Sequence, residues 1–351
     1  MGDARGRASC VLGIETSCDE TSAAVLQGDG SGETSSPGLR LRSSVVASQV
    51  CLHTRFGGVV PEVASRRHVE TIIPVIDQAL RDAGVALSDL TAVAATRGPG
   101  LVGAILVGLS AAKTMALALK VPFIGVNHIE AHMYANFIEH PDLRPPFVCL
   151  VVSGGHTDLV YLRDHGSYEV MGRTRDDAAG EAFDKVARVL GLGYPGGPAI
   201  DNAARGGDPG AVRFPRAFLE EGSYDFSFSG LKTAVVNFVR KAETSGVPLG
   251  IADIAASFQE AVVDVLVKKT VRAALDKHVS TLALAGGVAA NSRLREQLAR
   301  GASEAGLRLV SPSPALCTDN AAMVACAGYF RVARGEASSL DVPAVPDLDL
   351  E

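Results

Sequence analysis

The stretch VLGIETSCDETSAAV at residues 11–25 decides the fold, because a second stretch in the other half of the chain repeats its pattern. It consists of an apolar run, a short polar turn and a second apolar run, which is the usual signal for two strands joined as a hairpin. The stretch FVCLVVSGGHTDLVY at residues 147–161 has the same three parts in the same order. These two hairpins predict an internally duplicated protein.

A second repeated pair of segments follows the hairpins in the same order. The segment TAVAATRGPG at residues 91–100 predicts a buried strand that ends in a glycine turn, and an apolar helix through Lys113 comes next. The segment TLALAGGVAAN at residues 281–291 leads in the same way into a helix at 292–300. Strands that alternate with helices are typical of α/β folds, which bind ligands where the strands end. We therefore expect a duplicated, two-lobed α/β protein with a central cleft.

The expected boundaries follow from these repeats and from the composition between them. Residues 10–145 form the N-terminal lobe, which a C-terminal helix at 320–340 completes. Residues 146–319 form the C-terminal lobe, and the acidic residues 341–351 form a flexible tail.

The composition narrows the class of protein. A chain of 351 residues with 47% hydrophobic and 21% charged residues is typical of a globular protein with a sizeable core. The net charge of −6 excludes a general basic field, so we expect any polyanion to be bound by a local patch or with a partner's help. Lys113 interrupts the apolar run at residues 104–119, so we expect no membrane-spanning helix. The six cysteines have no C-x-x-C spacing, which favours free thiols in the cytoplasm.

Two segments contain residue types that bind metal ions. His128 and His132 are four residues apart in HIEAH, which places both imidazoles on one face of a helix. That spacing also fits an ordinary pair of histidines. Asp319 can supply a third, carboxylate ligand, although Asp319 or Asn320 is also a natural cap for the helix that follows. Spacing alone does not join Asp319 to the histidines. Ile129 stands where the HExxH motif of metallopeptidases needs its glutamate, which disfavours peptidase chemistry.

Other motifs indicate an anionic or hydroxylated ligand. The glycine pair of SGGH at residues 153–156 lets backbone N–H groups approach a phosphate closely, although a plain tight hairpin has the same composition. Asp177, Glu181 and Asp184 share one face of a predicted helix, and like charges on one face are destabilising. We interpret these acids as partners for the hydroxyl groups of a ribose or polyol. A proline-rich turn directs Asp201 toward the same place.

Seven motifs together resemble those of the bacterial TsaD family, which is related to archaeal, eukaryotic and mitochondrial threonylcarbamoyl-transferase proteins once described as sialoglycoprotein endopeptidases. The resemblance covers residues 11–340 and implies the actin/Hsp70/sugar-kinase fold. It also implies transfer of a threonylcarbamoyl group from threonylcarbamoyl-adenylate to N6 of the adenosine 3′ to the anticodon, in tRNAs that read codons beginning with A. The motifs, in chain order, are GIETSCDET, HIEAH, VSGGHT, DDAAGEAFDK, FSFSGLKT, AGGVAAN and CTDN.

The resemblance further implies site residues and partners. The family's metal ligands correspond to His128, His132 and Asp319, which would hold one divalent ion, iron or zinc, in each chain. The implied partners are tRNA, the adenylate substrate in the cleft, a paralogue that lacks the metal site and a small ATPase, in the cytoplasm and without a membrane. The implied substrate-binding residues are Val152, Ser153, Gly154, Gly155, His156, Asp184, Gly197, Asp201 and Asn291.

The sequence leaves the general base and two competing functions open. His156, Asp19 and the substrate phosphate are all candidates for the base. A small-molecule kinase shares the implied fold and would use an acid such as Asp184 as its base. A non-catalytic nucleotide-binding module would keep the glycine turns without needing the histidine pair. The three metal-ligating residues together favour the catalytic member of the family over its metal-free paralogue.

Overall fold

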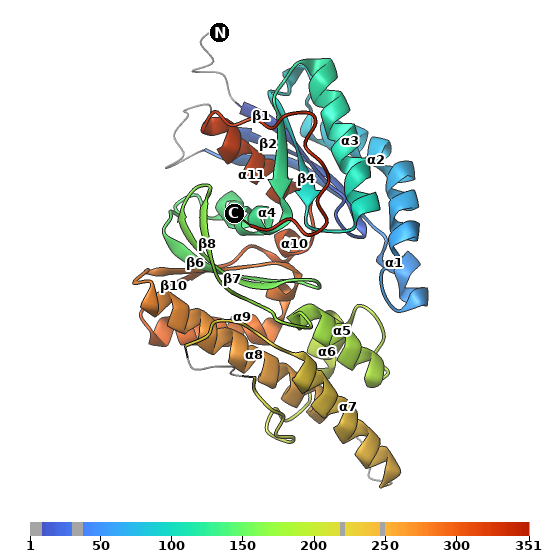
Figure 1. Ribbon diagram of the computed structural model, residues 1–351, viewed down its shortest axis with the longest axis vertical. Helices are drawn as coiled ribbons and strands as arrows, with labels where there is room; N and C mark the ends of the chain where they lie inside the picture. The colour runs from blue at the N-terminus through green and yellow to red at the C-terminus, as the bar shows by residue number, and fades with distance from the viewer. Residues whose placement is uncertain (1–8, 30–37, 218–221, 246–249, 351) are drawn as a thin grey trace. The chain divides into compact units, whose positions relative to one another are not determined.

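The computed structural model describes residues 9–29, 38–217, 222–245 and 250–350, which form two compact units (Figure 1). The first unit is discontinuous in sequence, because it combines Met1–Arg144 with Asp319–Glu351. The second unit is the continuous segment Pro145–Thr318.

Within the described residues, each unit contains a five-stranded sheet, and the two sheets have the same topology. The strand order is β3-β2-β1-β4-β5 in the first unit and β8-β7-β6-β9-β10 in the second. In each sheet the middle strand pairs antiparallel with its hairpin partner and parallel with the strand on its other side. This correspondence confirms the duplicated α/β architecture. The strands are β1 (Ser9–Glu15), β2 (Glu20–Gly28), β3 (Arg40–Ser48), β4 (Ala92–Gly98), β5 (Phe123–Asn127), β6 (Phe147–Val152), β7 (Thr157–Asp164), β8 (Ser167–Arg173), β9 (Thr281–Ala285) and β10 (Arg308–Val310).

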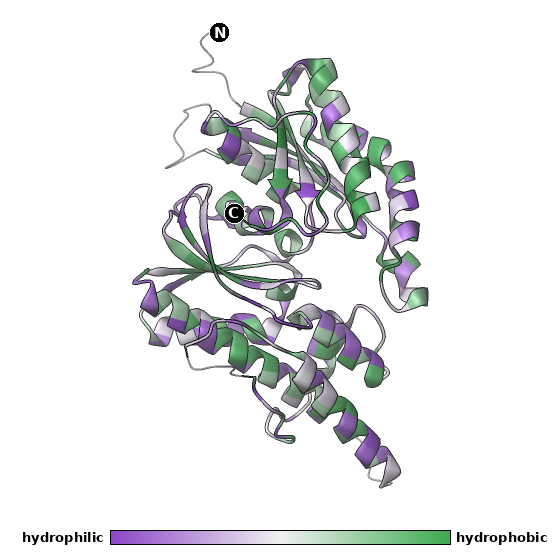
Figure 2. Ribbon diagram, viewed as in Figure 1, coloured by the Kyte–Doolittle hydropathy of each residue, from purple (hydrophilic) through white to green (hydrophobic). Residues whose placement is uncertain are grey.

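Helices cover both faces of the first sheet, and the strands β1, β4 and β5 are accordingly almost wholly buried (Figure 2). α2 and α3 cover one face, where Leu12 and Ile14 of β1 join their core. α11 covers the other face and comes very close to β1, because a Cβ at Gly13 would lie 2.6 Å from the backbone nitrogen of Ala325. The helices of this unit are α1 (Val50–His53), η1 (Thr54–Phe56), α2 (Pro61–Ala83), η2 (Leu87–Asp89), α3 (Val102–Leu119), α4 (His128–Glu139) and α11 (Ala321–Ala333).

By length and composition, α3 is apolar enough to cross a membrane, so our expectation that no helix reaches this limit is wrong. Lys113 does not prevent this, because it is the one charged residue among the 18 residues of α3. In the structure α3 packs against β4 and α2, and Ile105, Leu109 and Ala112 are buried in that core. The helix is therefore a core element of the first unit.

The second unit has one large aromatic core beneath its sheet. Phe183 packs edge-to-face on Phe258, and the rings of Phe226 and Phe228 are stacked, so two helices and one loop contribute aromatic rings to the same core. The helices of this unit are α5 (Ala179–Val189), α6 (Gly196–Ala204), α7 (Ser229–Thr244), α8 (Ile251–Asp276), η3 (Gly287–Ala290), α9 (Ser292–Glu304) and α10 (Pro314–Cys317).

The residues after α11 lie against the first unit, which differs from the flexible tail that we expected (Figure 1). The backbone N–H of Val345 donates to the carbonyl of Arg97 at 2.8 Å, and Lys113 Nζ donates to the carbonyl of Val342 at 2.6 Å. Val342 and Ala344 also pack on the core formed with α2 and α3. The acidic composition did not predict these contacts. They are made by the backbone and by the apolar residues that lie between the acids in the sequence.

Candidate metal centre

α4 presents the histidine pair from a firmly capped first turn. It begins directly after β5, where Asn127 Oδ1 accepts hydrogen bonds from the backbone N–H groups of Ile129 at 2.8 Å and Glu130 at 3.3 Å. This cap satisfies two of the donors that a helix start leaves open. His128 and His132 then lie one turn apart on one face, with ring centroids separated by 4.6 Å.

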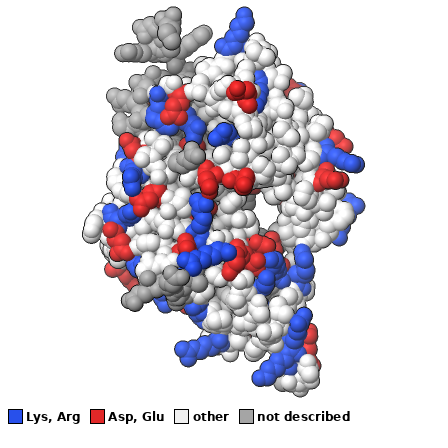
Figure 3. Space-filling view, in the orientation of Figure 1, with Lys and Arg blue, Asp and Glu red and all other residues white. Residues whose placement is uncertain are grey.

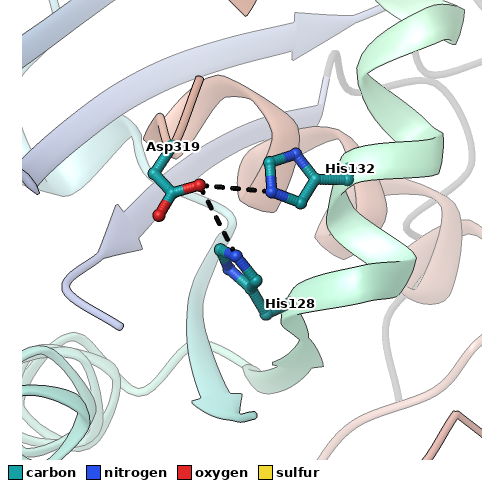
Figure 4. A group of neighbouring side chains, drawn as sticks. All are labelled: His128, His132 and Asp319. Atoms are coloured by element: carbon teal, nitrogen blue, oxygen red, sulfur yellow. Dashed lines mark ion pairs between the residues drawn. The ribbon is translucent and has the colours of Figure 1, made fainter. Parts of the chain in front are cut away.

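Asp319 joins the two histidines, and the neighbouring residue caps the next helix. Asn320 Oδ1 accepts from the backbone N–H of Met323 at 3.0 Å, so the capping role belongs to Asn320. Asp319 Oδ1 lies 3.2 Å from His132 Nε2 and 3.5 Å from His128 Nε2 (Figure 4). The structure thus favours the ligand interpretation of Asp319 over the cap.

The spacing of the three side chains suits a divalent ion. Metal bonds of about 2.0–2.2 Å in a tetrahedral arrangement place ligand atoms about 3.4 Å apart. The nitrogens of His128 and His132 and the oxygen of Asp319 lie within 4.8 Å of one another. Both ring nitrogens of the buried His132 lack a hydrogen bond to any residue that the structure describes, and Asp319 meets Nε2 without hydrogen-bond geometry. Two histidines and one carboxylate leave further positions open for a substrate.

Glu15 orients the His128 ring through Nδ1, the ring nitrogen that does not approach Asp319. Its carboxylate is fully buried and only accepts, so His128 donates from Nδ1 to Glu15 Oε2 at 3.1 Å and presents Nε2 to the metal position. Glu15 also accepts from the Thr96 hydroxyl at 2.7 Å and the Ser17 backbone N–H at 2.6 Å. Burial alone would lower the pKa of His128, but the carboxylates of Asp319 and Glu15 raise it to about 9. Burial alone would raise the pKa of Glu15, but the neighbouring His128 lowers it.

Glu130, the acid within HIEAH, has a structural role. It is fully buried on α4, and Arg331 of α11 donates to both of its carboxylate oxygens, at 3.1 and 2.8 Å. This bidentate ion pair connects α4, which carries the histidines, to α11, which follows Asp319. Because Arg331 occupies the carboxylate, Glu130 is not placed to act as the base of a peptidase.

The acids of the first hairpin turn gather near Asp319. Burial and the carboxylates of Asp319 and Asp19 raise the pKa of Glu20 to about 9. The Ser48 hydroxyl donates to Glu20 at 3.1 Å. Asp19, in the same turn, is buried.

The glycine turn between β6 and β7 lies in the second unit and is closed by its own backbone. Ser153 N–H donates to the carbonyl of His156 at 2.8 Å, while Gly154 and Gly155 are exposed. Val152, directly before the turn, is buried. α5 begins beside the turn, because a Cβ at Gly180 would lie 2.5 Å from the carbonyl oxygen of Ser153. The exposed glycines leave the backbone accessible to an anion.

Asp184 lies on α5 and contacts the first turn of α6, where Gly197 lies. Asp184 Oδ1 accepts from the Gly196 backbone N–H at 2.7 Å, which fixes the turn that leads into the helix. A Cβ at Gly197 would meet no atom within 4 Å, so this position is open.

Asp201 and Asn291 lie close to a single cavity in the same unit. The Ser292 hydroxyl donates to Asp201 Oδ1 at 2.8 Å, and Asn291 Nδ2 donates to Gln259 Oε1 at 2.8 Å. Asp201, Ser292 and Gln259 line a cavity of about 260 Å³. The candidate substrate residues all lie in the second unit, and the metal ligands all lie in the first.

Lysine side chains pair with Asp177 and Glu181, the acids that we interpreted as partners of a hydroxylated ligand. Lys185 Nζ lies 2.8 Å from a carboxylate oxygen of each, and Lys232 Nζ lies 2.8 Å from Asp177. These lysines balance the like charges and hold the pKa of Asp177 below its usual value against the effect of burial. Lys185 stands four residues after Glu181, so the sequence already contained the signal for that pair.

Comparisons with known sequences agree with the motifs. Residues 40–326 match the sequence model of the TsaD family, described as tRNA N6-adenosine threonylcarbamoyltransferase. The chain is 55% identical over 340 residues to proteins of that name from Clostridium botulinum (strain 657 / Type Ba4) and Moorella thermoacetica. In both cases the match covers 97% of this chain and 97% of the relative.

Two solved structures show the same fold at low identity. Full-length HypF, in a phosphate- and nucleotide-bound form, has a TM-score of 0.60 at 14% identity, over 93% of this chain and 46% of HypF. Component A of the (R)-2-hydroxyglutaryl-CoA dehydratase of Acidaminococcus fermentans has a TM-score of 0.51 at 16% identity, over 93% of this chain and 99% of that chain. The expected actin/sugar-kinase-like fold is thereby confirmed.

Proposed function

The chain belongs to the TsaD family of tRNA N6-adenosine threonylcarbamoyltransferases, and from this premise we propose the details of its reaction. The donor is threonylcarbamoyl-adenylate, and the acceptor is N6 of the adenosine 3′-adjacent to the anticodon in tRNAs that read codons beginning with A. The observation that carries the chemistry is the grouping of His128, His132 and Asp319.

The reaction joins a weak nucleophile to a weak electrophile. The exocyclic amine of adenine delocalises its lone pair into the ring, and the carbamoyl carbon is deactivated by its own nitrogen. A bound divalent ion, iron or zinc, would polarise the carbamoyl carbonyl. His128, His132 and Asp319 would hold that ion, and Glu15 keeps His128 in the tautomer that offers Nε2. N6 forms the new bond to the carbamoyl carbon, adenylate leaves, and Asp19, His156 or the departing phosphate takes the proton from N6.

We propose that the second unit binds the adenylate. The exposed Gly154 and Gly155 suit the phosphate, and the cavity beside Asp201 suits the nucleoside. Gly197 leaves room for the ligand at the start of α6, and Asp184 holds the turn before it.

Asp201→Asn is expected to weaken binding of the adenylate. Loss of a hydrogen bond to a charged acceptor corresponds to roughly a tenfold or greater rise in the dissociation constant. Calorimetry with a non-hydrolysable adenylate analogue measures it, and Asp164→Asn, an exposed acid in the same unit, is the matched control. Equal affinity in Asp201→Asn and the wild type would remove Asp201 from the substrate site.

The proposed protein partners are the paralogue without the metal site and the small ATPase. Apolar side chains on the outer face of α2 and α3 suit the paralogue, because Val69 and Ile73 are 64% exposed and Val102 and Leu106 are 49% exposed. Adjacent exposed apolar residues of this kind are typical of interaction sites.

Ile73→Asp is expected to weaken the complex with the paralogue at least about tenfold, because association would bury a charge without a partner. Analytical ultracentrifugation of the mixed proteins measures this effect. Val189→Asp, an exposed apolar position of the second unit, serves as the control and should leave association intact. An Ile73→Asp protein that associates normally would show that the paralogue binds elsewhere.

We place the reaction in the cytoplasm, where the six cysteines, which form no disulfide in the described residues, would stay reduced. The net charge is −6, and basic and acidic side chains are interspersed on the face in view in Figure 3. We therefore propose that local groups of basic residues on this chain contact the tRNA backbone and that a partner protein supplies further contacts.

Nucleoside analysis by mass spectrometry tests the proposed function. Bulk tRNA is isolated from cells depleted of this protein and compared after rescue with the wild type or with His128→Ala. We expect N6-threonylcarbamoyladenosine to be lost on depletion and restored by the wild type alone. Unchanged modification after depletion would contradict the proposal.

A further inference from the structure

We infer that the C-terminal segment 345–349 is a positioning element of the metal centre, acting through Asn127, the cap of α4. This inference rests on the proposed function, because α4 carries His128 and His132. It assigns a role to a segment whose composition suggested only a frayed end.

Asn127 is held at both ends of its side-chain amide. Oδ1 accepts from the N–H groups of the first turn of α4, and Nδ2 donates to the carbonyls of Leu348 at 3.3 Å and Asp349 at 3.0 Å. A primary amide donates only from its nitrogen and accepts at its oxygen. Two carbonyls on one side therefore turn the amide so that Oδ1 faces the helix. The segment selects the orientation that caps α4.

The same segment also closes the glycine turn at the end of β4. Gly100 N–H donates to the carbonyl of Pro346 at 3.0 Å. A Cβ at Gly98 would lie 1.9 Å from the carbonyl oxygen of Val345, and Gly98 has a φ of 153°, so this position requires glycine. The C-terminal segment runs beside β4 and ends beside α4 in Figure 1. The segment thus contacts the carboxyl ends of two parallel strands, β4 and β5, and β5 leads directly into α4.

The position of His128 explains why this support matters. His128 is the first residue of α4, directly after Asn127, and its Nδ1 is fixed to Glu15 on β1. If the cap is lost, the backbone of the first turn frays while Glu15 retains the ring. The angle at which Nε2 meets Asp319 is then no longer fixed. Loss of such outer supports lowers metal affinity roughly 10–100-fold in metal sites generally.

The contacts predict which changes in the segment matter. They use backbone carbonyls, so the side-chain charges of the segment are dispensable. Asp347→Asn keeps every carbonyl and should behave as the wild type. Asn127→Asp still accepts from α4 but sets a carboxylate against two carbonyl oxygens, so it should release the segment while keeping a cap.

The experiment compares the full-length chain with a chain that ends at Ala344. Val342 and Ala344, which pack on the core, are retained. We measure the zinc dissociation constant of each metal-free protein by chelator competition, and amide hydrogen exchange at Ile129 and Glu130. We expect the shortened chain to bind zinc about tenfold more weakly and to exchange those two amides faster, with α8 unchanged. Asn127→Asp should make the C-terminal segment more sensitive to carboxypeptidase.

Two results would overturn the inference. One is a shortened chain whose zinc affinity and α4 exchange equal those of the full-length chain. The other is an Asp347→Asn protein that shows the same losses as the shortened chain, since side-chain charge would then be responsible. If the full-length chain itself binds no zinc and no iron, the proposed metal fails, whereas exchange at Ile129 and Glu130 still decides the role of the segment.

Discussion

Asp319→Ala is expected to lower turnover at least about a hundredfold, the scale seen when one group that stabilises transition-state charge is removed. Asp319 Oδ1 is the atom that both histidine Nε2 atoms approach, so its loss leaves two ligands where three are needed. His128→Ala should have an effect of the same size. Single-turnover transfer to tRNA, with metal content measured on the same samples, gives the comparison.

His140→Ala is the matched control, because His140 stands at the end of α4, eight residues and about two turns beyond His132. It should retain both metal content and turnover. An Asp319→Ala protein that lacks metal and still transfers at the wild-type rate would exclude the metal from the mechanism.

Arg331→Met is expected to destabilise the first unit by about 3–5 kcal/mol, because it leaves the Glu130 carboxylate buried without its partner. The double variant Glu130→Leu with Arg331→Met should recover most of this loss, since apolar residues of similar size often replace a buried ion pair at little cost. A urea titration measures the free energy of unfolding of this unit, with hydrogen exchange of the α4 and α11 amides as the probe.

Arg67→Met is the control for the Arg331 series. Arg67 pairs with Glu70 on the exposed face of α2, and exposed pairs contribute about 0–1 kcal/mol. Equal losses from Arg67→Met and Arg331→Met would mean that burial of Glu130 has no energetic consequence. A double variant no more stable than Arg331→Met alone would show that the pair positions α4 against α11 in a way that packing does not replace.

The sequence predicted what depends on neighbouring residues. The hairpins, the glycine turns and the His128–His132 pair were recognisable, because strand, turn and helix periods are local properties. Asp319 could be joined to the histidines only through the resemblance, since it stands 187 positions after His132 in the chain.

The sequence did not predict contacts between distant segments. Glu15 and His128, or Glu130 and Arg331, meet because the sheet and α11 bring them together, and no spacing rule connects them. The C-terminal segment was misjudged for the same reason. Its hydrogen bonds are made by backbone groups, and side-chain composition does not predict such bonds.

The division of the first unit between the two ends of the chain has a consequence for synthesis. The second unit is continuous in sequence and can fold as it leaves the ribosome. One face of the first sheet, by contrast, stays uncovered until α11 has been synthesised. Asp319 is added more than nine-tenths of the way along the chain. A nascent chain released before that point has both histidines but lacks the carboxylate, so the three candidate metal ligands are present together only when translation is nearly finished.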